Sequence, residues 1–233
     1  MEHVGIVIER LTAAKLILNR DKCNFFSIQI SLLGFVIGLH GKSVDPTKFA
    51  NTDEWAAPTT AKQILSFLGT LNFFREFIPL FSLVSAPLDA LQSRTEPFTL
   101  HKEQMQALNT LKNILTHRPI LSFPAFSKPF YVATDASDVG VGAVLYRRPK
   151  GEIFPNEINY ISFMTRCLQQ RERKYGATKK EKLWIVFALC RFYYYLWGGH
   201  FHLYTDHRAL IYLHTQQNLN SMMVGWQDVI LNY

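Results

Sequence analysis

The sequence has few cysteines, no long apolar run and only a moderate share of charged residues. Its three cysteines (Cys23, Cys167 and Cys190) lie too far apart for a CxxC zinc pair, and we interpret them as reduced thiols. The longest apolar run, Leu183–Cys190, is much shorter than the roughly 18 residues that span a membrane. Charged residues near the N-terminus argue against a signal peptide. We therefore expect an intracellular protein, in the cytoplasm or nucleus, without a membrane partner.

Acidic residues are scarcer than basic ones, and the composition is otherwise ordinary. The chain has 233 residues, of which 48% are hydrophobic, and this excludes a disordered protein. Its 18 acidic residues face 25 basic ones, giving a net charge of +7. Seven lysines and arginines lie within the segment 166–182. A basic stretch of this kind is typical of nucleic-acid binding, but it also fits a solvated helical face, and charge alone leaves both interpretations open.

Periodicity and turn residues predict a mainly helical first half after two short strands. We expect a first helix over 1–19, strands over 24–30 and 32–38, and a turn over 40–42. Asp45-Pro46 has the residues of a helix start, and Thr59 or Thr60 caps the next helix. Further helices are expected over 45–55, from the threonine cap toward Pro79, over 85–91 and over 100–116. Prolines at 119, 124 and 129 then mark a linker, and we place the domain boundary within 122–128.

The second half predicts a mixed α/β sheet. Strands are expected over 130–135, 142–147, 153–161 and 201–205. Helices are expected over 178–196, 208–213 and 221–233. Gly198-Gly199 has the residues of a left-handed helix cap.

Three carboxylates occupy positions where chemistry could take place. Asp135 and Asp206 end apolar strands, and Glu181 lies in the first turns of a long helix. If they converged, they would bind hard divalent cations through oxygen, and two such ions roughly 4 Å apart support in-line attack on a phosphodiester. The alternative is that each Asp caps the element that follows it. Spacing alone favours the capping interpretation. Gly140-Val141-Gly142 is not a dinucleotide loop, because a strand follows it rather than a helix.

Three motifs resemble the ribonuclease H domain of gypsy-type long-terminal-repeat retrotransposon polyproteins. Thr134–Asp138 followed by Gly140–Leu145 is similar to the start of that domain. Tyr175 with Thr178–Leu183 is similar to the start of a helix in that domain. Tyr204–Leu210 is similar to its Thr-Asp-His-x-x-Leu motif. The resemblance implies that Asp135, Glu181 and Asp206 are the catalytic, metal-binding carboxylates.

The first half resembles other parts of the reverse transcriptase of these elements. The resemblance implies the end of a palm over 1–42, a helical thumb or connection over 43–121, and an RNase H-like domain over 126–233. Leu33, Gly34 and Phe35 fall in a hairpin similar to the one that grips the primer end. Gly69 and Phe73 match positions on the thumb helix that lies against a primer–template duplex. The expected fold class is a mostly helical thumb-like segment followed by a mixed-sheet RNase H-like domain, incomplete at its C-terminus.

The resemblance also implies a function with its cofactor and partners. Two Mg²⁺ ions, or Mn²⁺, would serve hydrolysis of the RNA strand of an RNA–DNA hybrid, leaving 3′-hydroxyl and 5′-phosphate ends. Phosphate contacts are assigned to Lys174, Lys179, Lys180 and Lys182. The rest of the reverse transcriptase or polyprotein is the expected protein partner, since the Tyr-x-Asp-Asp polymerase motif is absent from the sequence. The fourth carboxylate of this family has no match here, so an inactive remnant that at most binds nucleic acid is the competing hypothesis.

Overall fold

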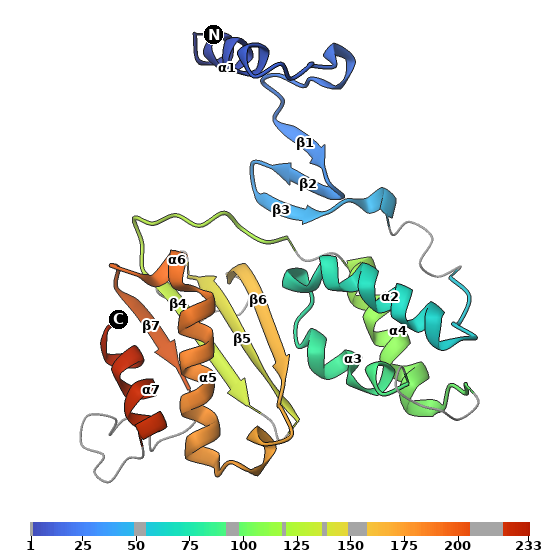
Figure 1. The fold of residues 1–233 in the computed structure, drawn as a ribbon, viewed down its shortest axis with the longest axis vertical. Helices are drawn as coiled ribbons and strands as arrows, with labels where there is room; N and C mark the ends of the chain where they lie inside the picture. The colour runs from blue at the N-terminus through green and yellow to red at the C-terminus, as the bar shows by residue number, and fades with distance from the viewer. Residues whose placement is uncertain are drawn as a thin grey trace.

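A computed structural model of the chain describes residues 2–48, 55–91, 98–117, 120–136, 139–148, 158–205 and 221–233. Within this part, a small antiparallel sheet, a group of helices and a four-stranded mixed sheet follow one another along the chain (Figure 1). This arrangement confirms the expected fold class of a mostly helical segment followed by a mixed sheet with helices. None of the helices found in the described part is both long and apolar enough to cross a membrane.

The first unit, which we call the hairpin unit, begins with a helix that buries none of its residues. Helix α1 (Glu2–Ala13) has no buried residue, and a short turn of 3-10 helix, η1 (Arg20–Lys22), follows it. Three antiparallel strands come next in the order β1-β2-β3. Their bounds are β1 (Gln29–Leu32), β2 (Phe35–Gly38) and β3 (Gly41–Val44). Val44 is buried among the helices that come after it, so the sheet is anchored through its third strand.

The second unit, which we call the helical unit, is built around α2. Its elements are η2 (Pro46–Lys48), α2 (Ala61–Phe73), η4 (Arg75–Phe77), α3 (Phe81–Asp89) and α4 (Lys102–His117). The hydroxyl of Thr60 accepts a hydrogen bond from the backbone N–H of Gln63, which confirms the expected cap. Buried Ile64, Leu68 and Leu71 repeat at helical spacing, so one face of α2 points into the core and the other stays open.

The third unit, which we call the sheet unit, has the strand order β6-β5-β4-β7. Its strands are β4 (Phe130–Ala136), β5 (Gly140–Arg147), β6 (Asn159–Cys167) and β7 (Phe201–Tyr204). Its helices are η6 (Glu172–Lys174), α5 (Ala177–Arg191), α6 (Tyr193–Leu196) and α7 (Ser221–Leu231). Strand β7 runs parallel to β4, whereas β5 is antiparallel to both of its neighbours.

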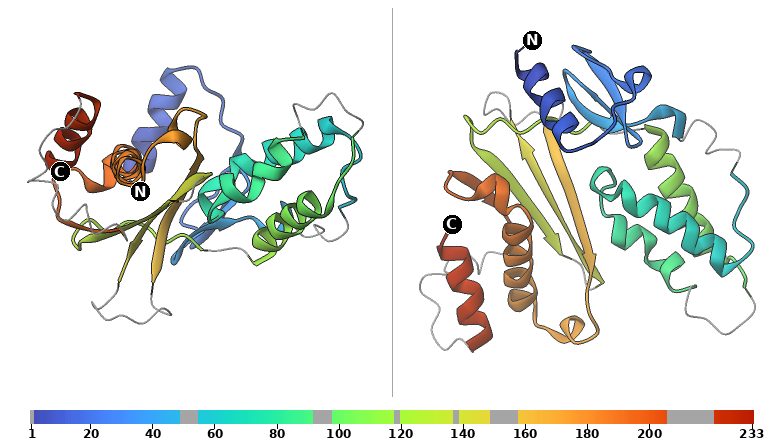
Figure 2. Two further views of the ribbon diagram at one scale, coloured as in Figure 1. Left: turned by 90° about the horizontal axis from the view of Figure 1, so that it is seen from below. Right: turned by 45° about the horizontal axis from the view of Figure 1, so that its top comes forward.

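The four-stranded sheet lies between two layers of helices (Figure 2). Helix α5 packs on one face, where Val132, Leu145 and Ile185 share a core. Helix α3 contacts β5 and β6 from the opposite face. The alternation of side chains along β4 and β5 therefore sorts residues between α5 and the helical unit.

Several expected boundaries were wrong. The strand predicted over 153–161 is β6, which begins at Asn159, and the helix predicted over 178–196 is divided between α5 and α6. The turn predicted over 40–42 instead opens β3 at Gly41. The helix predicted over 45–55 is only the short η2 in its described part, and the helix predicted over 208–213 lies outside the described residues. The left-handed cap is confirmed by the φ of 75° at Gly198.

Candidate nucleic-acid interface and metal site

Asp135 stands at the exposed end of β4. It pairs across the ladder with Gly142 of β5, and directly opposed residues of an antiparallel pair share a face of the sheet. Both residues line a cavity of about 220 Å³ together with Leu80, which precedes α3. The Asp135 carboxylate therefore belongs to the face of the sheet that meets the helical unit. It is open to solvent, as a carboxylate that binds an external group has to be.

Glu181 comes from the helix on the other face of the sheet. It lies in the second turn of α5, and the residue is only 8% exposed. Helix α5 packs directly on β4, so the two carboxylates belong to adjoining elements. A carboxylate buried this deeply is stable only where positive charge or hydrogen-bond donors lie close by.

The third expected ligand, Asp206, lies outside the described residues, so its place relative to the other two is not part of the structure. Among the residues that are described, no three His, Cys, Asp or Glu side chains form a group that could hold a metal ion. Asp135 and Glu181 nevertheless have the oxygen donors that Mg²⁺ and Mn²⁺ prefer. A shared cation site would therefore need at least one further ligand besides these two carboxylates.

The basic segment divides into exposed and buried cations. Lys174 is exposed, and Lys179 and Lys180 are partly exposed near the start of α5. The Lys179 ammonium lies 3.9 Å from the centre of the Tyr175 ring, so this cation is held in place while remaining accessible. These three lysines can reach an external phosphate.

Lys182 requires a correction. The sequence placed it with the phosphate-binding lysines, but the residue is 0% exposed. Its ammonium nitrogen has no hydrogen-bond partner among the described residues, and burial lowers its pKa. The helical periodicity that exposes Lys179 and Lys180 turns Lys182 inward, beside buried Ile185 on the next turn. A phosphate on the protein surface is out of its reach.

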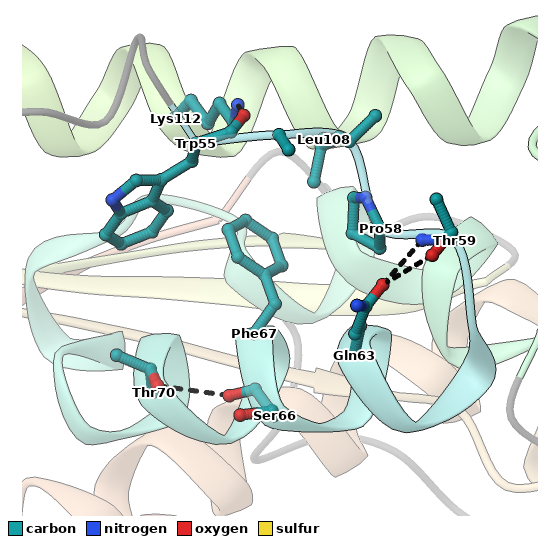
Figure 3. Close-up of a pocket in the computed structure, with 11 residues that line it drawn as sticks. Trp55, Pro58, Thr59, Gln63, Ser66, Phe67, Thr70, Leu108 and Lys112 are labelled. Atoms are coloured by element: carbon teal, nitrogen blue, oxygen red, sulfur yellow. Dashed lines mark hydrogen bonds between the residues drawn. The ribbon is translucent and has the colours of Figure 1, made fainter.

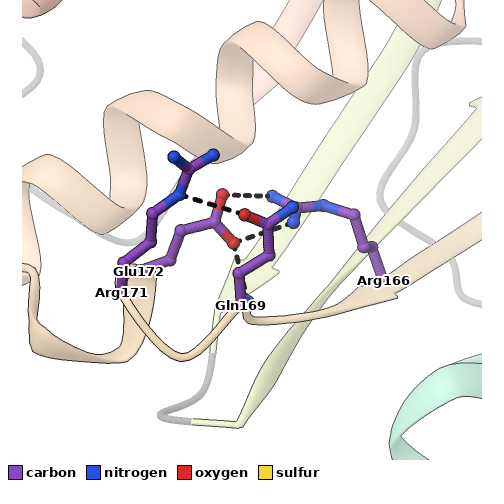
Figure 4. Close-up of polar contacts among 4 residues, drawn as sticks. All are labelled: Arg166, Gln169, Arg171 and Glu172. Atoms are coloured by element: carbon purple, nitrogen blue, oxygen red, sulfur yellow. Dashed lines mark hydrogen bonds and ion pairs between the residues drawn. The ribbon is translucent and has the colours of Figure 1, made fainter.

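A tight ion pair organises the loop that leads to these lysines (Figure 4). Arg166 on β6 donates to both carboxylate oxygens of Glu172, at 2.8 and 3.3 Å, and the backbone N–H of Gln169 donates to the same carboxylate at 2.8 Å. Burial opposes ionisation of Glu172, but these donors outweigh it and hold its pKa below the usual value. Arg166 is thus engaged inside the protein rather than available to a phosphate, which sequence reasoning missed.

The open face of α2 carries the two residues assigned to duplex contact. Gly69 is exposed, and a Cβ built there would meet no atom within 4 Å. Phe73 is 55% exposed, and its ring stacks on Phe35 of β2 with centroids 5.2 Å apart. The positions are four residues apart, so they lie on one stripe of the helix. Nothing in the packing of α2 requires a glycine at position 69.

The three hairpin residues assigned to primer contact form the tip between β1 and β2. Leu33 and Gly34 have φ values of 53° and 84°, which is the left-handed backbone that a two-residue hairpin turn demands. Leu33 is 77% exposed, whereas Phe35 is half-buried against Phe73. The ammonium of Lys42 sits 3.9 Å from the Phe35 ring centre and pairs with Glu76. The hairpin tip and the open face of α2 are therefore joined through stacked aromatic rings.

A cavity beside α2 belongs to the packing of the helical unit rather than to these residues (Figure 3). It has a volume of about 480 Å³, and Trp55, Phe67 and Lys112 help to line it. The Lys112 ammonium donates to the backbone carbonyl of Trp55, and the Trp55 and Phe67 rings meet edge to face. The cation is therefore already used to tie α4 to the segment before α2.

Residues 125–233 match the family described as the RNase H-like domain found in reverse transcriptase. Over its whole length the chain is also similar to retrotransposon proteins. It is 33% identical to the retrovirus-related Pol polyprotein from transposon opus of Drosophila melanogaster, with 100% of this chain and 24% of that protein covered. It is 31% identical to the transposon Tf2-3 polyprotein of Schizosaccharomyces pombe, with 97% and 17% covered. The chain belongs to the gypsy-type retrotransposon Pol family. It spans about a quarter or less of the length of these relatives.

Solved structures support the fold of this Pol fragment. The foamy viral protease-reverse transcriptase dRH in complex with double-stranded DNA aligns with a TM-score of 0.76 at 21% identity, covering 97% of this chain and 40% of that one. The foamy viral protease-reverse transcriptase in complex with an RNA/DNA hybrid aligns with a TM-score of 0.74 at 20% identity, covering 98% and 32%. At these identities the likeness concerns the fold alone. It includes the succession of hairpin, helical and sheet units in one chain.

Proposed function

We propose that this Pol fragment hydrolyses the RNA strand of RNA–DNA hybrids with the help of divalent cations. The observation that carries the proposal is the position of Asp135 and Glu181 on adjoining elements of an RNase H-like domain, one at the end of β4 and one near the start of α5. Asp206, in the motif that follows β7, is proposed as the third ligand. Mg²⁺ or Mn²⁺ bound there would supply a nucleophile at neutral pH and stabilise developing charge on the phosphodiester.

The protein residues themselves would bind and orient the hybrid. Lys174, Lys179 and Lys180 would contact phosphates without reading sequence, because point charges on flexible stems recognise the backbone rather than base edges. Gly69 would let the duplex backbone approach α2 closely, and Phe73 would lie against sugars. The hairpin tip at Leu33 would contact the primer end. These contacts favour a hybrid or primer–template duplex as the nucleic-acid partner.

The remaining parts of the polyprotein are the proposed protein partner. The relatives that match are several times longer than this chain, and the sequence lacks the Tyr-x-Asp-Asp motif of a polymerase site. Three free cysteines support a reducing compartment, so we place the activity in the cytoplasm or nucleus.

Cleavage of an end-labelled RNA–DNA hybrid tests the proposal. The chain is incubated with Mg²⁺, with Mn²⁺ and with EDTA, and the products are resolved by length. The expected result is metal-dependent cutting of the RNA strand only, lost in Glu181→Gln and Asp206→Asn. Asp228→Asn is the matched control, because Asp228 is an exposed carboxylate on α7 that belongs to none of the three motifs. Hybrid binding without any cutting, in folded protein, would favour an inert nucleic-acid-binding remnant instead.

A further inference from the structure

Thr165 on β6 is the centre of a polar contact between the helical unit and the sheet unit. Its backbone carbonyl accepts a hydrogen bond from the Arg75 guanidinium at 2.7 Å, and its hydroxyl accepts one from the backbone N–H of Ser82 at 2.8 Å. Two residues along β6, the Cys167 thiol donates to the carbonyl of Ser82 at 3.0 Å. Burial raises the pKa of that thiol, so it remains a donor. Three side chains thus join residues more than 80 positions apart.

Two glycines of β5 lie beside this contact and face the same helix. A Cβ built at Gly142 would come within 2.6 Å of Leu80 Cδ2, and one built at Gly140 within 2.7 Å of Leu83 Cδ2. Real Cβ atoms essentially never come this close to another atom, so a side chain at either glycine would force the end of the facing leucine to move. The two glycines are two residues apart on one strand, so a Cβ at either position would lie on the same face of the sheet, the one opposite α5. Leu80 and Leu83 are spaced by three residues, so both can face the strand from the start of α3.

We infer that Gly140 and Gly142 form a docking seam for the start of α3, through which the helical unit and the sheet unit are held as one body. The Gly-x-Gly pattern, which has no dinucleotide to bind, acquires its role from this contact: it leaves room for the side chains of Leu80 and Leu83 against the strand. The partner of the seam is a segment of the same chain, and the hydrogen bonds at Thr165 fix its register along β6.

The seam borders the carboxylate proposed as catalytic. Gly142 pairs with Asp135, and Leu80 lines the same cavity as both. Docking therefore sets the distance between the open face of α2, where a duplex would lie, and the end of β4. This consequence for the position of cutting rests on the proposed function, whereas the docking itself does not.

Substitution of Gly142 by valine tests the seam through the sign of a stability change. Valine is a favourable residue in the interior of a strand, so in a free sheet Gly142→Val would leave the melting temperature unchanged or raise it. With α3 docked, the added methyl groups occupy the space of Leu80, and the melting temperature should fall by about 3–10 °C. An unchanged or higher melting temperature would overturn the inference.

Shortening the opposing side chain provides the specific rescue. Leu80→Ala should remove most of the loss, so that the double variant melts within about 3 °C of Leu80→Ala alone. Gly140→Ala behaves differently, because its Cβ would also meet the Arg166 carbonyl oxygen at 2.8 Å and Cys167 Cα at 3.2 Å. Leu83→Ala should therefore fail to rescue it. A Gly142→Val defect that persists with Leu80→Ala would place the clash elsewhere and contradict the docking seam.

A distance measurement then reads the docking directly, without depending on cleavage. Spin labels on exposed Cys190 of α5 and on Asn109→Cys of α4 report the separation of the two units, with Cys23→Ser and Cys167→Ser in the background. Serine at 167 keeps a donor for the Ser82 carbonyl. The labelled protein without a seam substitution should give one narrow distance distribution, and Gly142→Val should broaden or shift it. Adding Leu80→Ala to Gly142→Val should make the distribution narrow again. A broad distance distribution without any seam substitution would refute the claim that the two units are held as one body, even if the hybrid is cut normally.

Discussion

At the scale of single residues, burial separates cations of similar sequence context into different roles. Lys179 and Lys182 lie on the same helix, three residues apart, yet one contacts a partly exposed tyrosine ring and the other is fully enclosed. The hydrophobic pattern of α5 is continuous enough to hide this difference, because apolar residues surround the helix on most sides. The sequence of α5 therefore does not show clearly which of its residues are buried and which are exposed, because this helix packs on both the sheet and α7.

Replacement of Lys182 tests its interior position. Lys182→Met keeps the length of the side chain and removes an ammonium that lacks a hydrogen-bond partner within the described structure. Thermal unfolding at pH 7 should show an unchanged or higher melting temperature, because a buried charge is costly to desolvate. Affinity for a labelled hybrid should stay within about twofold, whereas Lys174→Ala weakens binding and lowers its salt dependence. A clear loss of hybrid affinity in Lys182→Met would restore the phosphate role.

Glu172 should control the acid stability of the sheet unit. Its pKa is held below the usual value, so the stabilisation from its contacts is present above about pH 4.3 and is lost as the pH falls through the folded-state pKa. At pH 7, Glu172→Gln should lower the free energy of unfolding by about 1–3 kcal/mol, because it weakens the bidentate pair with Arg166. The side chains of Arg166 and Glu172 in this pair are 26% and 9% exposed. Urea unfolding at several pH values measures both effects.

The comparison variant for Glu172 is Glu76→Gln. The Lys42–Glu76 pair is more exposed, at 31% and 39%, so its loss should cost less than about 1 kcal/mol. The difference in the free energy of unfolding between the Glu172→Gln variant and the unsubstituted chain should become smaller below about pH 4. A difference in the free energy of unfolding that stays constant down to pH 3 would contradict the lowered pKa assigned to Glu172.

At the scale of elements, local chemistry predicted helix caps better than strand limits. The Thr60 cap and the left-handed Gly198 depend only on adjacent residues, and both are confirmed. Strand β6 was placed too early because its later residues, Thr165 and Arg166, are polar and look like loop. Their hydrogen bonds go to the helical unit and to Glu172, which lie far away in sequence or beyond a turn. Tertiary contacts of this kind leave no periodic signal.

The same limit applies to the candidate site. The positions of Asp135 and Glu181 at the ends of their elements were readable from the sequence, since apolar runs precede or follow them. Which side of the sheet Asp135 faces depends on strand register, and register is set by pairing with Gly142 and its neighbours. The docking role of that glycine could not be predicted, because its partner Leu80 lies about 60 residues earlier in the chain.

Helix α2 offers a test in which stability and binding should change in opposite directions. Gly69→Ala should stabilise the chain by about 0.5–1 kcal/mol, because alanine is the better helix former and its Cβ meets no neighbour. The same methyl group would stand where a duplex backbone approaches, so hybrid affinity should fall about threefold or more. Calorimetry and fluorescence anisotropy give the two values.

Gly225→Ala is the matched control for Gly69, because Gly225 also lies inside an exposed helix with open space around its Cα. It should raise stability without changing hybrid affinity. Equal affinities for Gly69→Ala and the unsubstituted chain would remove α2 from the nucleic-acid interface.

At the scale of the whole molecule, the chain combines the open face of α2 and a carboxylate-bearing sheet in one docked arrangement. The hairpin tip stacks on α2 through Phe35 and Phe73, and α3 joins the sheet through Thr165. Each unit therefore contacts the next through side chains rather than only through the connecting chain. A duplex bound along α2 would meet a sheet whose position is set by the same set of contacts.

The most direct test of the account measures hybrid cutting and hybrid binding in parallel for Asp135→Asn. Asparagine keeps the size of the side chain and removes the negative charge that a divalent cation requires. We predict that cutting of the RNA strand falls by about 100-fold or more while the Kd for the hybrid stays within about threefold. Cutting that survives the substitution at a comparable rate would contradict the assignment of Asp135 and, with it, the proposed metal site.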